Sequence, residues 1–411
     1  MADVTKIEGI TVSKDIVIKS SGLGIDFGGS VIKIVYRTKD DYEKACDPKN
    51  LEPLATLRTV SFAREDRKRA FEFARDNAFV IRDGEEFPSV FTTGCGSSEY
   101  TKEIVEICKI TPKIITEHDC FAKCFHFLSH VLSRDQLLHP IPYDAMEHPL
   151  GFCEELHSLL KLMNANKISK VHDLEMVEKL EEAVREVRNT DFVNLPKDSR
   201  PLAEAEDIFP CLLAINGSAF SGFIVKKDAS FEYLDATQLG GRFFHGLGSL
   251  LTGCKTYEEL IEMAAKGNHK KIDTHKNDML FDTGEDDLAA KFGDMKTDSL
   301  VFNFGKAVGK TAGDFEPADI ASALLRGFVK EKAERCRLVA SLHDLKSIFF
   351  VGSFVNHEIV RKVYTEMFTF SNYFIDAVHR KKIAISKYDF VKNGSHFGAL
   401  GCLINTLDPF I

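Results

Sequence analysis

The sequence predicts an α/β protein with two lobes that share one architecture. At 411 residues the chain is longer than one ordinary hydrophobic core supports, so two lobes of roughly 200 residues each are expected. Residues 23–36 and 209–236 each read as short strands joined by small residues, and strand-like and helical stretches follow each segment. Because this beginning occurs twice, we expect the same arrangement of strands and helices in both lobes.

The composition is that of a globular protein and excludes several classes of function. Hydrophobic residues make up 44% and charged residues 28% of the chain, and the formal net charge is −9. A nucleic-acid binder with a broad basic surface is not expected, because such proteins gather Lys and Arg to neutralise phosphates. No apolar run reaches the roughly 18 residues of a transmembrane helix. The 10 cysteines form no metal-type CxxC pair, so we expect reduced thiols in a soluble cytoplasmic protein, with nuclear entry as an alternative.

The chain divides into four parts. Residues 1–20 lack the profile of a signal peptide and are interpreted as a flexible lead-in or an edge strand. Residues 21–150 are expected to form the first lobe, residues 151–206 an inserted helical segment or arm, and residues 207–411 the second lobe. The first lobe should contain strands at residues 22–27, 31–36, 57–63, 89–94 and 113–116, and helices at 67–78, 97–109 and 117–132. Beyond its opening hairpin, the second lobe should contain strands at residues 347–353 and 382–386, and helices at 241–253, 256–267, 317–342, 356–368 and 394–404.

The turn of the first expected hairpin has the residues for a phosphate site. Gly28 and Gly29 let backbone N–H groups approach an anion, and Asp26 can hold a magnesium ion through water. Ser30 adds a hydroxyl, and Lys33 can place an ammonium group on the same phosphates. An ordinary Gly-Gly hairpin and a solvated lysine remain the alternatives for these residues.

Two further small-residue turns occur in the expected second lobe. Gly217 follows an apolar strand and is accompanied by the hydroxyls of Ser218 and Ser221. Gly240 and Gly241 directly precede a helix, where backbone N–H groups and the helix dipole favour a phosphate. Both turns are therefore candidate phosphate contacts.

Small residues also cluster near the C-terminus. Gly352 and Ser353 follow a strand, and residues 394–401 place "GSHFGALG" at the start of a helix. Bulkier side chains at these positions would keep a flat ring away from the backbone, so we expect the two segments to hold an adenosine.

The phosphate turns and the adenosine segments follow one another in the same order as in the actin–hexokinase–Hsp70 ATPase superfamily, which this chain resembles. Proteins of that superfamily have two ribonuclease-H-like lobes. The segments "GIDFGGSVIKIVY", "LGGRFFHGLGSLLTGCKTYEELIEMAAKG", "FFVGSF" and "HFGALG" narrow the resemblance to the type II, eukaryotic-type pantothenate kinases. The resemblance excludes the lead-in, residues 151–206 and much of residues 268–316. It implies ATP- and Mg²⁺-dependent phosphorylation of pantothenate to 4'-phosphopantothenate, the first step of coenzyme A biosynthesis. A homodimer with acyl-CoA as feedback inhibitor is also implied.

The resemblance assigns the catalytic base. In that family a glutamate just after a strand exit accepts the proton, and Glu117 matches it here. The residue type suits the task, because a carboxylate facing a nucleotide can accept the proton of a substrate hydroxyl as it attacks the γ-phosphoryl group. Capping of the following helix by residues 117–119 is the alternative. His118 and His245 are interpreted as packed or surface histidines.

The substrate side of the implied site both matches the family and departs from it. Ser218 and Ser221 match the serines that hold pantothenate in the family. Tyr233 aligns with the arginine that grips the pantothenate carboxylate, and Arg242 replaces the third glycine of the "GGG" turn. Arg242 either substitutes for the lost arginine or fills the pocket. A catalytically impaired relative that binds nucleotide or acyl-CoA as a regulator or scaffold is therefore the alternative to an active kinase.

Overall fold

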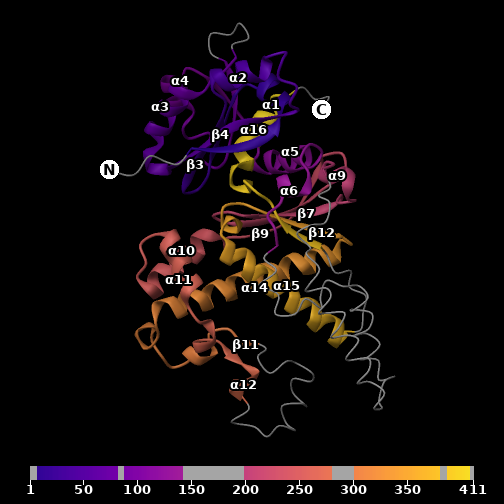
Figure 1. The fold of residues 1–411 in the computed structure, drawn as a ribbon. Helices are drawn as coiled ribbons and strands as arrows, with labels where there is room; N and C mark the ends of the chain where they lie inside the picture. Colours follow the sequence, from indigo (N-terminus) through magenta and orange to yellow (C-terminus); the bar gives the residue numbers. More distant parts are fainter. Residues whose placement is uncertain (1–6, 82–87, 142–198, 280–299, 380–386, 408–411) are drawn as a thin grey trace.

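The computed structural model describes residues 7–81, 88–141, 199–279, 300–379 and 387–407. The described elements form an elongated molecule with one large sheet in each of two lobes (Figure 1), which confirms the predicted α/β architecture. Most of the expected insertion at residues 151–206, and the strand expected at residues 382–386, lie outside the described residues. Within the described part, no helix combines the length and apolarity needed to cross a membrane.

The first lobe contains a six-stranded sheet in the order β1-β4-β3-β2-β5-β6. The pairs β1–β4, β4–β3 and β3–β2 are antiparallel, whereas β2–β5 and β5–β6 are parallel. The strands are β1 (Glu8–Ser13), β2 (Leu23–Phe27), β3 (Val31–Tyr36), β4 (Leu54–Ala63), β5 (Ser89–Thr93) and β6 (Thr111–Ile114). The helices are α1 (Lys14–Lys19), α2 (Lys39–Cys46), η1 (Arg64–Asp66), α3 (Arg67–Asn77), α4 (Thr101–Cys108), α5 (Glu117–Ser129) and α6 (Arg134–Leu137).

The lead-in expected at residues 1–20 contains regular structure from Glu8 onward. Strand β1 pairs with β4 along its whole length, and α1 follows it directly. Ile10 and Val12 point into the core while Thr11 between them is exposed, which is the alternation of a half-buried strand. This segment is therefore an edge strand and a short helix and not a flexible lead-in.

The second lobe contains a five-stranded sheet in the order β9-β8-β7-β12-β13. This order repeats β4-β3-β2-β5-β6 of the first lobe: β7 pairs antiparallel with β8 and parallel with β12, as β2 pairs with β3 and β5. The duplication expected from the sequence is therefore present in the strand order. The strands are β7 (Cys211–Asn216), β8 (Phe220–Val225), β9 (Phe231–Thr237), β12 (Ser347–Val351) and β13 (Lys387–Phe390), with a separate two-stranded sheet of β10 (Thr274–His275) and β11 (Leu300–Phe302).

Four of the described helices lie on the outer side of the second sheet (Figure 1): α10 (Gly241–Thr252), α11 (Tyr257–Lys266), α14 (Pro317–Leu342) and α15 (Glu358–His379). Helices α9 (Leu202–Ala205) and α16 (Phe397–Ile404) lie on its other side, toward the first lobe, and α12 (Lys276–Met279) follows β10. Short 3₁₀ turns are η5 (His269–Lys271), η6 (Gly305–Ala307), η7 (Ala312–Asp314), η8 (Phe354–Asn356) and η9 (Gly394–His396). Pro317 occupies the first turn of α14, where its missing N–H would have no partner in any case.

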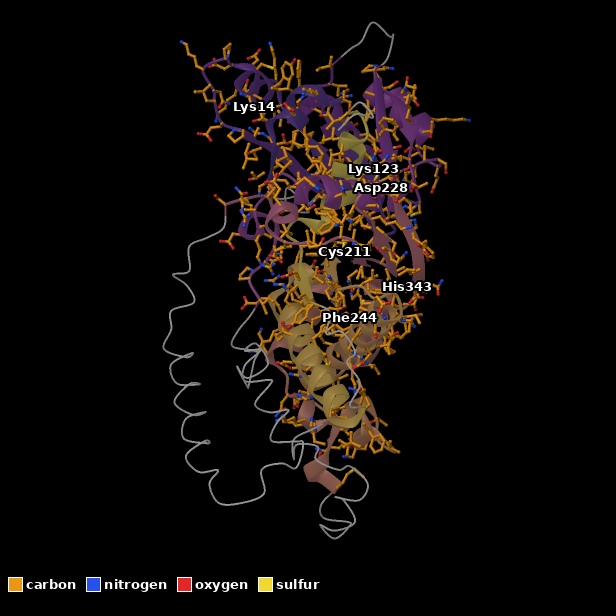
Figure 2. All side chains as sticks on the ribbon, turned by 90° about the vertical axis from the view of Figure 1, so that its right-hand side faces the viewer. Lys14, Lys123, Cys211, Asp228, Phe244 and His343 are labelled. Carbon is orange, nitrogen blue, oxygen red and sulfur yellow. The ribbon has the colours of Figure 1, made fainter. Side chains whose placement is uncertain are left out.

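The central strands β7 and β12 of the second sheet are buried on both faces. Along β7, Cys211 and Leu213 belong to the core that includes α5, whereas Leu212 and Ala214 belong to the core under α14 and α15. Figure 2 labels one residue of each core, Cys211 and Phe244, among the side chains of the second lobe. The apolar run from Cys211 to Ile215 is what burial of β7 on both faces requires.

Helices α5 and α16 connect the two lobes. Although α16 falls in residues 207–411, it packs against α5 and β2 of the first lobe (Figure 1). The approach is close, because a Cβ added at Gly401 of α16 would lie 2.3 Å from Cys120 O of α5. Their shared core contains Phe125 and Phe397 together with Phe349 of the second sheet. The last helix thus belongs structurally to the first lobe, which the sequence did not indicate.

Candidate active site

A buried carboxylate and a lysine lie opposite each other in the first hairpin. Asp26 of β2 and Lys33 of β3 are cross-strand partners, and Asp26 Oδ2 is 3.6 Å from Lys33 Nζ. Asp26 is only 1% exposed, and its Oδ1 has no hydrogen-bond partner among the described residues. Burial raises the pKa of Asp26, and the charge of Lys33 opposes this shift. The lysine expected to reach phosphates therefore lies against the buried aspartate and balances its charge.

Glu117 is the first residue of α5, but it does not cap the helix. The cap is Thr116, whose hydroxyl accepts a hydrogen bond from the backbone N–H of Asp119 at 3.3 Å. The Glu117 side chain retains an exposed surface although protein surrounds much of it. This partial burial, with a smaller contribution from the charge of Asp26, raises the pKa of Glu117 to about 7, and Lys33 opposes the shift. A carboxyl group with this pKa can exchange a proton near neutral pH.

The glycine turns of the two lobes meet. The place that a Cβ would occupy at Gly29 lies 3.3 Å from Ser218 Oγ and 3.6 Å from Arg242 Nη1. In the second lobe, the backbone N–H of Gly241 donates to Gly217 O at 2.8 Å, which holds the start of α10 against the β7–β8 turn. Residues expected to contact phosphates from the two halves of the sequence thus lie close together, with Gly28, Ser30 and Gly240 in the same turns. The backbone N–H groups of Gly240 and Gly241 donate to Gln238 O and Gly217 O, so the phosphate donors expected at the start of α10 are used within the protein.

Gly352 and Gly394, from the two segments expected to hold an adenosine, lie beside the second turn, whereas residues 397–401 of the same segment are buried in α16 against the first lobe and are not available to a ligand. Gly352 has a φ of +112°, and a Cβ there would lie 2.3 Å from Asn216 O at the end of β7. A Cβ at Gly394 of η9 would lie 2.9 Å from Gly352 N. Ser353 is exposed. Asn216 itself is buried, and its Oδ1 accepts a hydrogen bond from Tyr364 at 2.8 Å, so its side chain serves the core and not the turn.

Tyr233 and Ser221 lie on strands β9 and β8. Tyr233 is 50% exposed, and its ring is 5.2 Å from that of His118, the residue after Glu117. His118 also packs edge-on against Phe223, and burial lowers its pKa. This packing agrees with the interpretation of His118 as a packed histidine. Ser221 pairs in register with Ala236 and is partly exposed.

The structure adds a histidine that the sequence did not single out. His396 of η9 hydrogen-bonds through Nε2 to Ser61 Oγ at 3.3 Å and through Nδ1 to Ser395 Oγ at 3.1 Å. Burial and the nearby charge of Lys33 lower its pKa to about 4, so it is neutral at physiological pH. Ser61 and His396 are 335 residues apart in the sequence, and no local pattern signals their contact.

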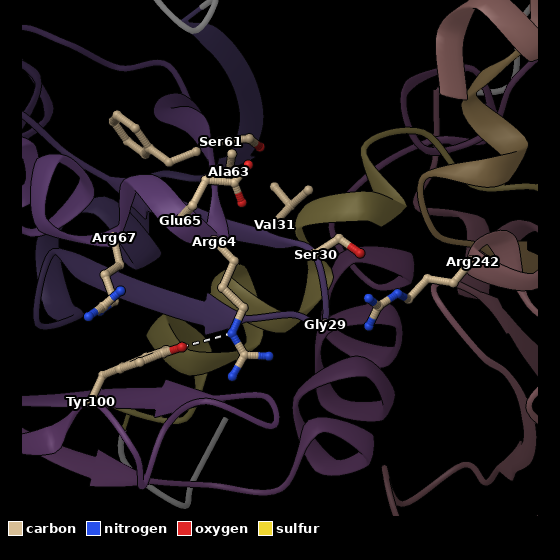
Figure 3. Close-up of a pocket in the computed structure, with 11 residues that line it drawn as sticks. Gly29, Ser30, Val31, Ser61, Ala63, Arg64, Glu65, Arg67, Tyr100 and Arg242 are labelled. Carbon is tan, nitrogen blue, oxygen red and sulfur yellow. Dashed lines mark hydrogen bonds between the residues drawn. The ribbon is translucent and has the colours of Figure 1, made fainter. Parts of the chain in front are cut away.

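A cavity of about 780 Å³ opens beside the first glycine turn (Figure 3). It is lined by Gly29, Ser30, Val31, Ser61, Phe62, Ala63, Arg64, Glu65, Arg67, Tyr100 and Arg242. Two of the three lining arginines, Arg64 and Arg67, pair with Glu99 and Glu103, so Arg242 is the lining arginine whose charge is available to an anion. Arg242 is the single lining residue from the second lobe, so the recess lies where the two lobes face each other.

The residues present fit a magnesium ion held largely by water and phosphate oxygens. Mg²⁺ in phosphate-transferring sites uses one or two carboxylates, and water and substrate oxygens complete its octahedron. Asp26 Oδ1 is a carboxylate oxygen without a hydrogen-bond partner in the described chain. The described residues contain no group of three or more His, Cys, Asp or Glu side chains that could enclose a metal by themselves.

Comparison with known proteins identifies relatives along most of the chain. A family model described as Fumble matches residues 22–405. Pantothenate kinase 1 of Oryza sativa subsp. japonica is 27% identical over 391 residues, which are 93% of this chain and 47% of that protein. Pantothenate kinase 1 of Arabidopsis thaliana is 34% identical over 204 residues, which are 49% of this chain and 50% of that protein. The matched region thus spans about half the length of these curated relatives.

Proposed function

The chain belongs to the Fumble family, and on this basis we propose that it is a kinase that transfers the γ-phosphoryl group of ATP to pantothenate. The names of the relatives from rice and Arabidopsis support the choice of substrate. The observation that carries the proposal is the grouping of Glu117 with Asp26 and Lys33, beside glycine turns from both lobes. The product is 4'-phosphopantothenate, an intermediate on the way to coenzyme A.

The reaction needs one proton acceptor and many contacts that hold the phosphates. The hydroxyl oxygen of pantothenate forms a bond to the γ-phosphorus while the bond from that phosphorus to the bridging oxygen of ADP breaks. Glu117 takes the hydroxyl proton, and ADP carries away the electron pair of the broken bond. Backbone N–H groups of the turn at Gly28 to Ser30 hold the phosphates, and Ser218 of the second turn faces them, whereas the N–H of Gly217 donates to Ala219 O at 3.0 Å and stabilises its own turn. Asp26 would hold a Mg²⁺ ion through water, and this ion would supply positive charge to the phosphate oxygens.

A direct assay tests this proposal. Purified protein with γ-labelled ATP and pantothenate should form labelled 4'-phosphopantothenate, and Glu117→Ala should form none. Asp119→Asn is the matched control: Asp119 lies in the same first turn of α5, pairs with Lys123 at 3.2 Å, and its loss should leave turnover within about twofold. Equal turnover by parent and Glu117→Ala would remove Glu117 from the mechanism.

A second candidate is a catalytically impaired member that binds nucleotide or acyl-CoA as a regulator or scaffold. It is favoured by Tyr233, which stands where the resemblance places the arginine that grips the substrate carboxylate. A charged hydrogen bond contributes about 1.5–3 kcal/mol, so its loss weakens substrate binding by about one to two orders of magnitude. Tyr233→Arg should therefore raise kcat/KM for pantothenate. Nucleotide binding without any turnover, in the parent and in this variant, would favour the second candidate.

The oligomeric state and the cellular location of the protein are proposed from the family resemblance. We place it in the cytoplasm as a homodimer that acyl-CoA can inhibit, and α14 is a candidate contact surface because Leu338 and Leu342 near its end are exposed. Sedimentation of the purified protein tests the dimer, and a titration with acetyl-CoA during turnover tests the inhibition.

A further inference from the structure

Arg242 is directed from the second lobe at the phosphate turn of the first lobe. It is the second residue of α10, and its Nη1 lies 3.6 Å from the place that a Cβ would occupy at Gly29. Figure 3 shows the side chain extending toward Gly29 and Ser30 across the space between their ribbons. A guanidinium at this place faces the backbone N–H groups that we expect to hold phosphates.

The positive charge of Arg242 is not used by the protein itself. Arg64 and Arg67 line the same recess, but Arg64 Nη2 lies 2.8 Å from Glu99 Oε2 and Arg67 Nε lies 3.0 Å from Glu103 Oε2. In the part of the chain that the structure describes, Arg242 has neither an ion-pair partner nor a side-chain hydrogen bond. The side chain is exposed, so an arriving anion can reach it without breaking an existing pair.

The position of Arg242 favours the nucleotide over the carboxylate of pantothenate. Tyr233, which stands in place of the carboxylate-binding arginine, contacts His118 next to the proposed base. Arg242 faces Gly29 at the tip of the first hairpin across the same cavity. Tyr233 and Arg242, the two residues that depart from the family pattern, therefore lie in different parts of the site. The guanidinium of Arg242 faces Gly29 and does not replace the arginine that is missing at position 233.

We propose that Arg242 binds the terminal phosphates of the nucleotide from the second lobe, opposite the Gly28–Ser30 turn. Its bidentate guanidinium then completes the enclosure of the triphosphate and neutralises charge on the group that is transferred. This inference rests on the proposed kinase function, and it assigns to this chain a phosphate contact that a glycine at position 242 could not make. Because the arginine comes from the opposite lobe, the contact also draws the two lobes together on the nucleotide.

Equilibrium binding to the full-length chain tests the inference. The dissociation constants of AMP, ADP and ATP, each with Mg²⁺, are measured by calorimetry for the parent, Arg242→Ala, Arg242→Lys and the control Arg67→Gln. Arg242→Ala should weaken ATP by about tenfold to a hundredfold and AMP by less than about twofold. Arg242→Lys should recover part of the loss, and Arg67→Gln should bind like the parent because the charge of Arg67 is already paired with Glu103.

Three results would overturn the inference. Unchanged ATP binding in Arg242→Ala would leave Arg242 without a role in nucleotide recognition. An equal loss for AMP and ATP would place the effect at the adenosine or in the fold, which circular dichroism of the variant would detect. A rise in the KM for pantothenate alone would assign Arg242 to the substrate carboxylate. Should the parent fail to phosphorylate pantothenate, the proposed function fails, whereas the nucleotide titrations still decide the role of Arg242.

Discussion

Asp26, Lys33 and Glu117 show how the charges of the candidate site are balanced before a ligand arrives. Asp26 loses hydration by burial, which raises its pKa, and Lys33 compensates for part of this loss at 3.6 Å. Glu117 is affected by both neighbours: the carboxylate of Asp26 raises its pKa and the ammonium of Lys33 lowers it. A phosphate that draws Lys33 away from Asp26 would change the proton affinity of Glu117, so nucleotide binding and base strength are linked.

The pH dependence of turnover should report Glu117. A general base must be unprotonated, and the pKa of Glu117 is about 7, so kcat/KM for pantothenate should rise with pH and level off above that value. Initial rates across about pH 5.5 to 9 at saturating ATP measure the profile. A flat profile through neutral pH, or a midpoint near the usual glutamate value, would contradict this prediction.

The raised pKa of Glu117 also predicts how this residue affects the stability of the folded protein. Its folded pKa of about 7 lies above the ordinary value of 4.5, so between these values the folded protein binds more protons than the unfolded chain. Stability from this group is therefore present at low pH and is lost as the pH rises through the folded pKa. Glu117→Gln should melt at a higher temperature than the parent at about pH 8, with the difference shrinking toward about pH 5. A lower melting temperature of the variant at the higher pH would show that the charge stabilises the fold.

For single residues, the sequence predicts which side chains can bind or react better than it predicts which side chains they contact. Asp26, Gly29, Ser218 and Glu117 could be singled out because glycine turns and strand exits are local patterns. The pairing of Lys33 with Asp26 follows from the hairpin register, which the turn residues alone do not establish. The contact of Ser61 with His396 was not predictable, since it depends on the whole fold bringing η9 back to β4.

At the scale of elements, the packing of α5 against α16 connects the two lobes. Glu117 begins α5, and α16 lies against α5 and against β2, which contains Asp26. Gly401 allows this packing, because its missing side chain leaves room for Cys120 O of α5. The distance between the Glu117 and Asp26 carboxyl groups therefore depends on the contact between these helices.

Alanine at Gly401 tests this contact. The added methyl group would lie 2.3 Å from Cys120 O, so the helices must separate, and overpacking of this kind costs about 1–3 kcal/mol. The matched control is Gly246→Ala in α10, where nothing lies within 4 Å of the new Cβ and helix propensity should stabilise the protein by up to about 1 kcal/mol. Urea unfolding measures both. If Gly401→Ala proves as stable as the parent, the helices do not pack as described.

Local sequence patterns predicted most elements but not their partners. Helices at residues 241–253, 256–267 and 317–342 were expected close to the observed α10, α11 and α14, because each has a turn signal and an apolar face. The strand expected at residues 113–116 begins two residues earlier, as β6 (Thr111–Ile114). The placement of α16 in the first lobe was missed, because an apolar helix has the same pattern whichever sheet it covers.

At the scale of the whole molecule, the duplicated strand order could be predicted from the two hairpin-like segments, and the common core could not. One hydrophobic cluster contains Val12 of β1, Phe125 of α5, Phe349 of β12 and Phe397 of α16. This cluster joins the first sheet to the second, in addition to one cluster within each lobe, so part of the apolar surface of each lobe is buried against the other. Two lobes that share a core are expected to unfold together.

Thermal unfolding should therefore show one transition, and ATP with Mg²⁺ should move it as a whole. A ligand that binds only the folded protein stabilises it by about 2.7 kcal/mol at a hundred times its dissociation constant. Calorimetric scans with ATP, and with adenosine as the comparison ligand, measure the shift. Two separate transitions, of which ATP moves only one, would show that the lobes bind and unfold independently.

The central claim is that both glycine turns close on one triphosphate beside Glu117. The most direct measurement is a structure of Glu117→Gln with ATP, Mg²⁺ and pantothenate, since the variant removes the proton acceptor and should hold the unreacted complex. We predict the γ-phosphate between the Gly28–Ser30 turn and the Gly217–Ser218 turn, with the pantothenate hydroxyl at the position 117 side chain. A nucleotide bound outside these turns, or a substrate hydroxyl far from position 117, would contradict the account.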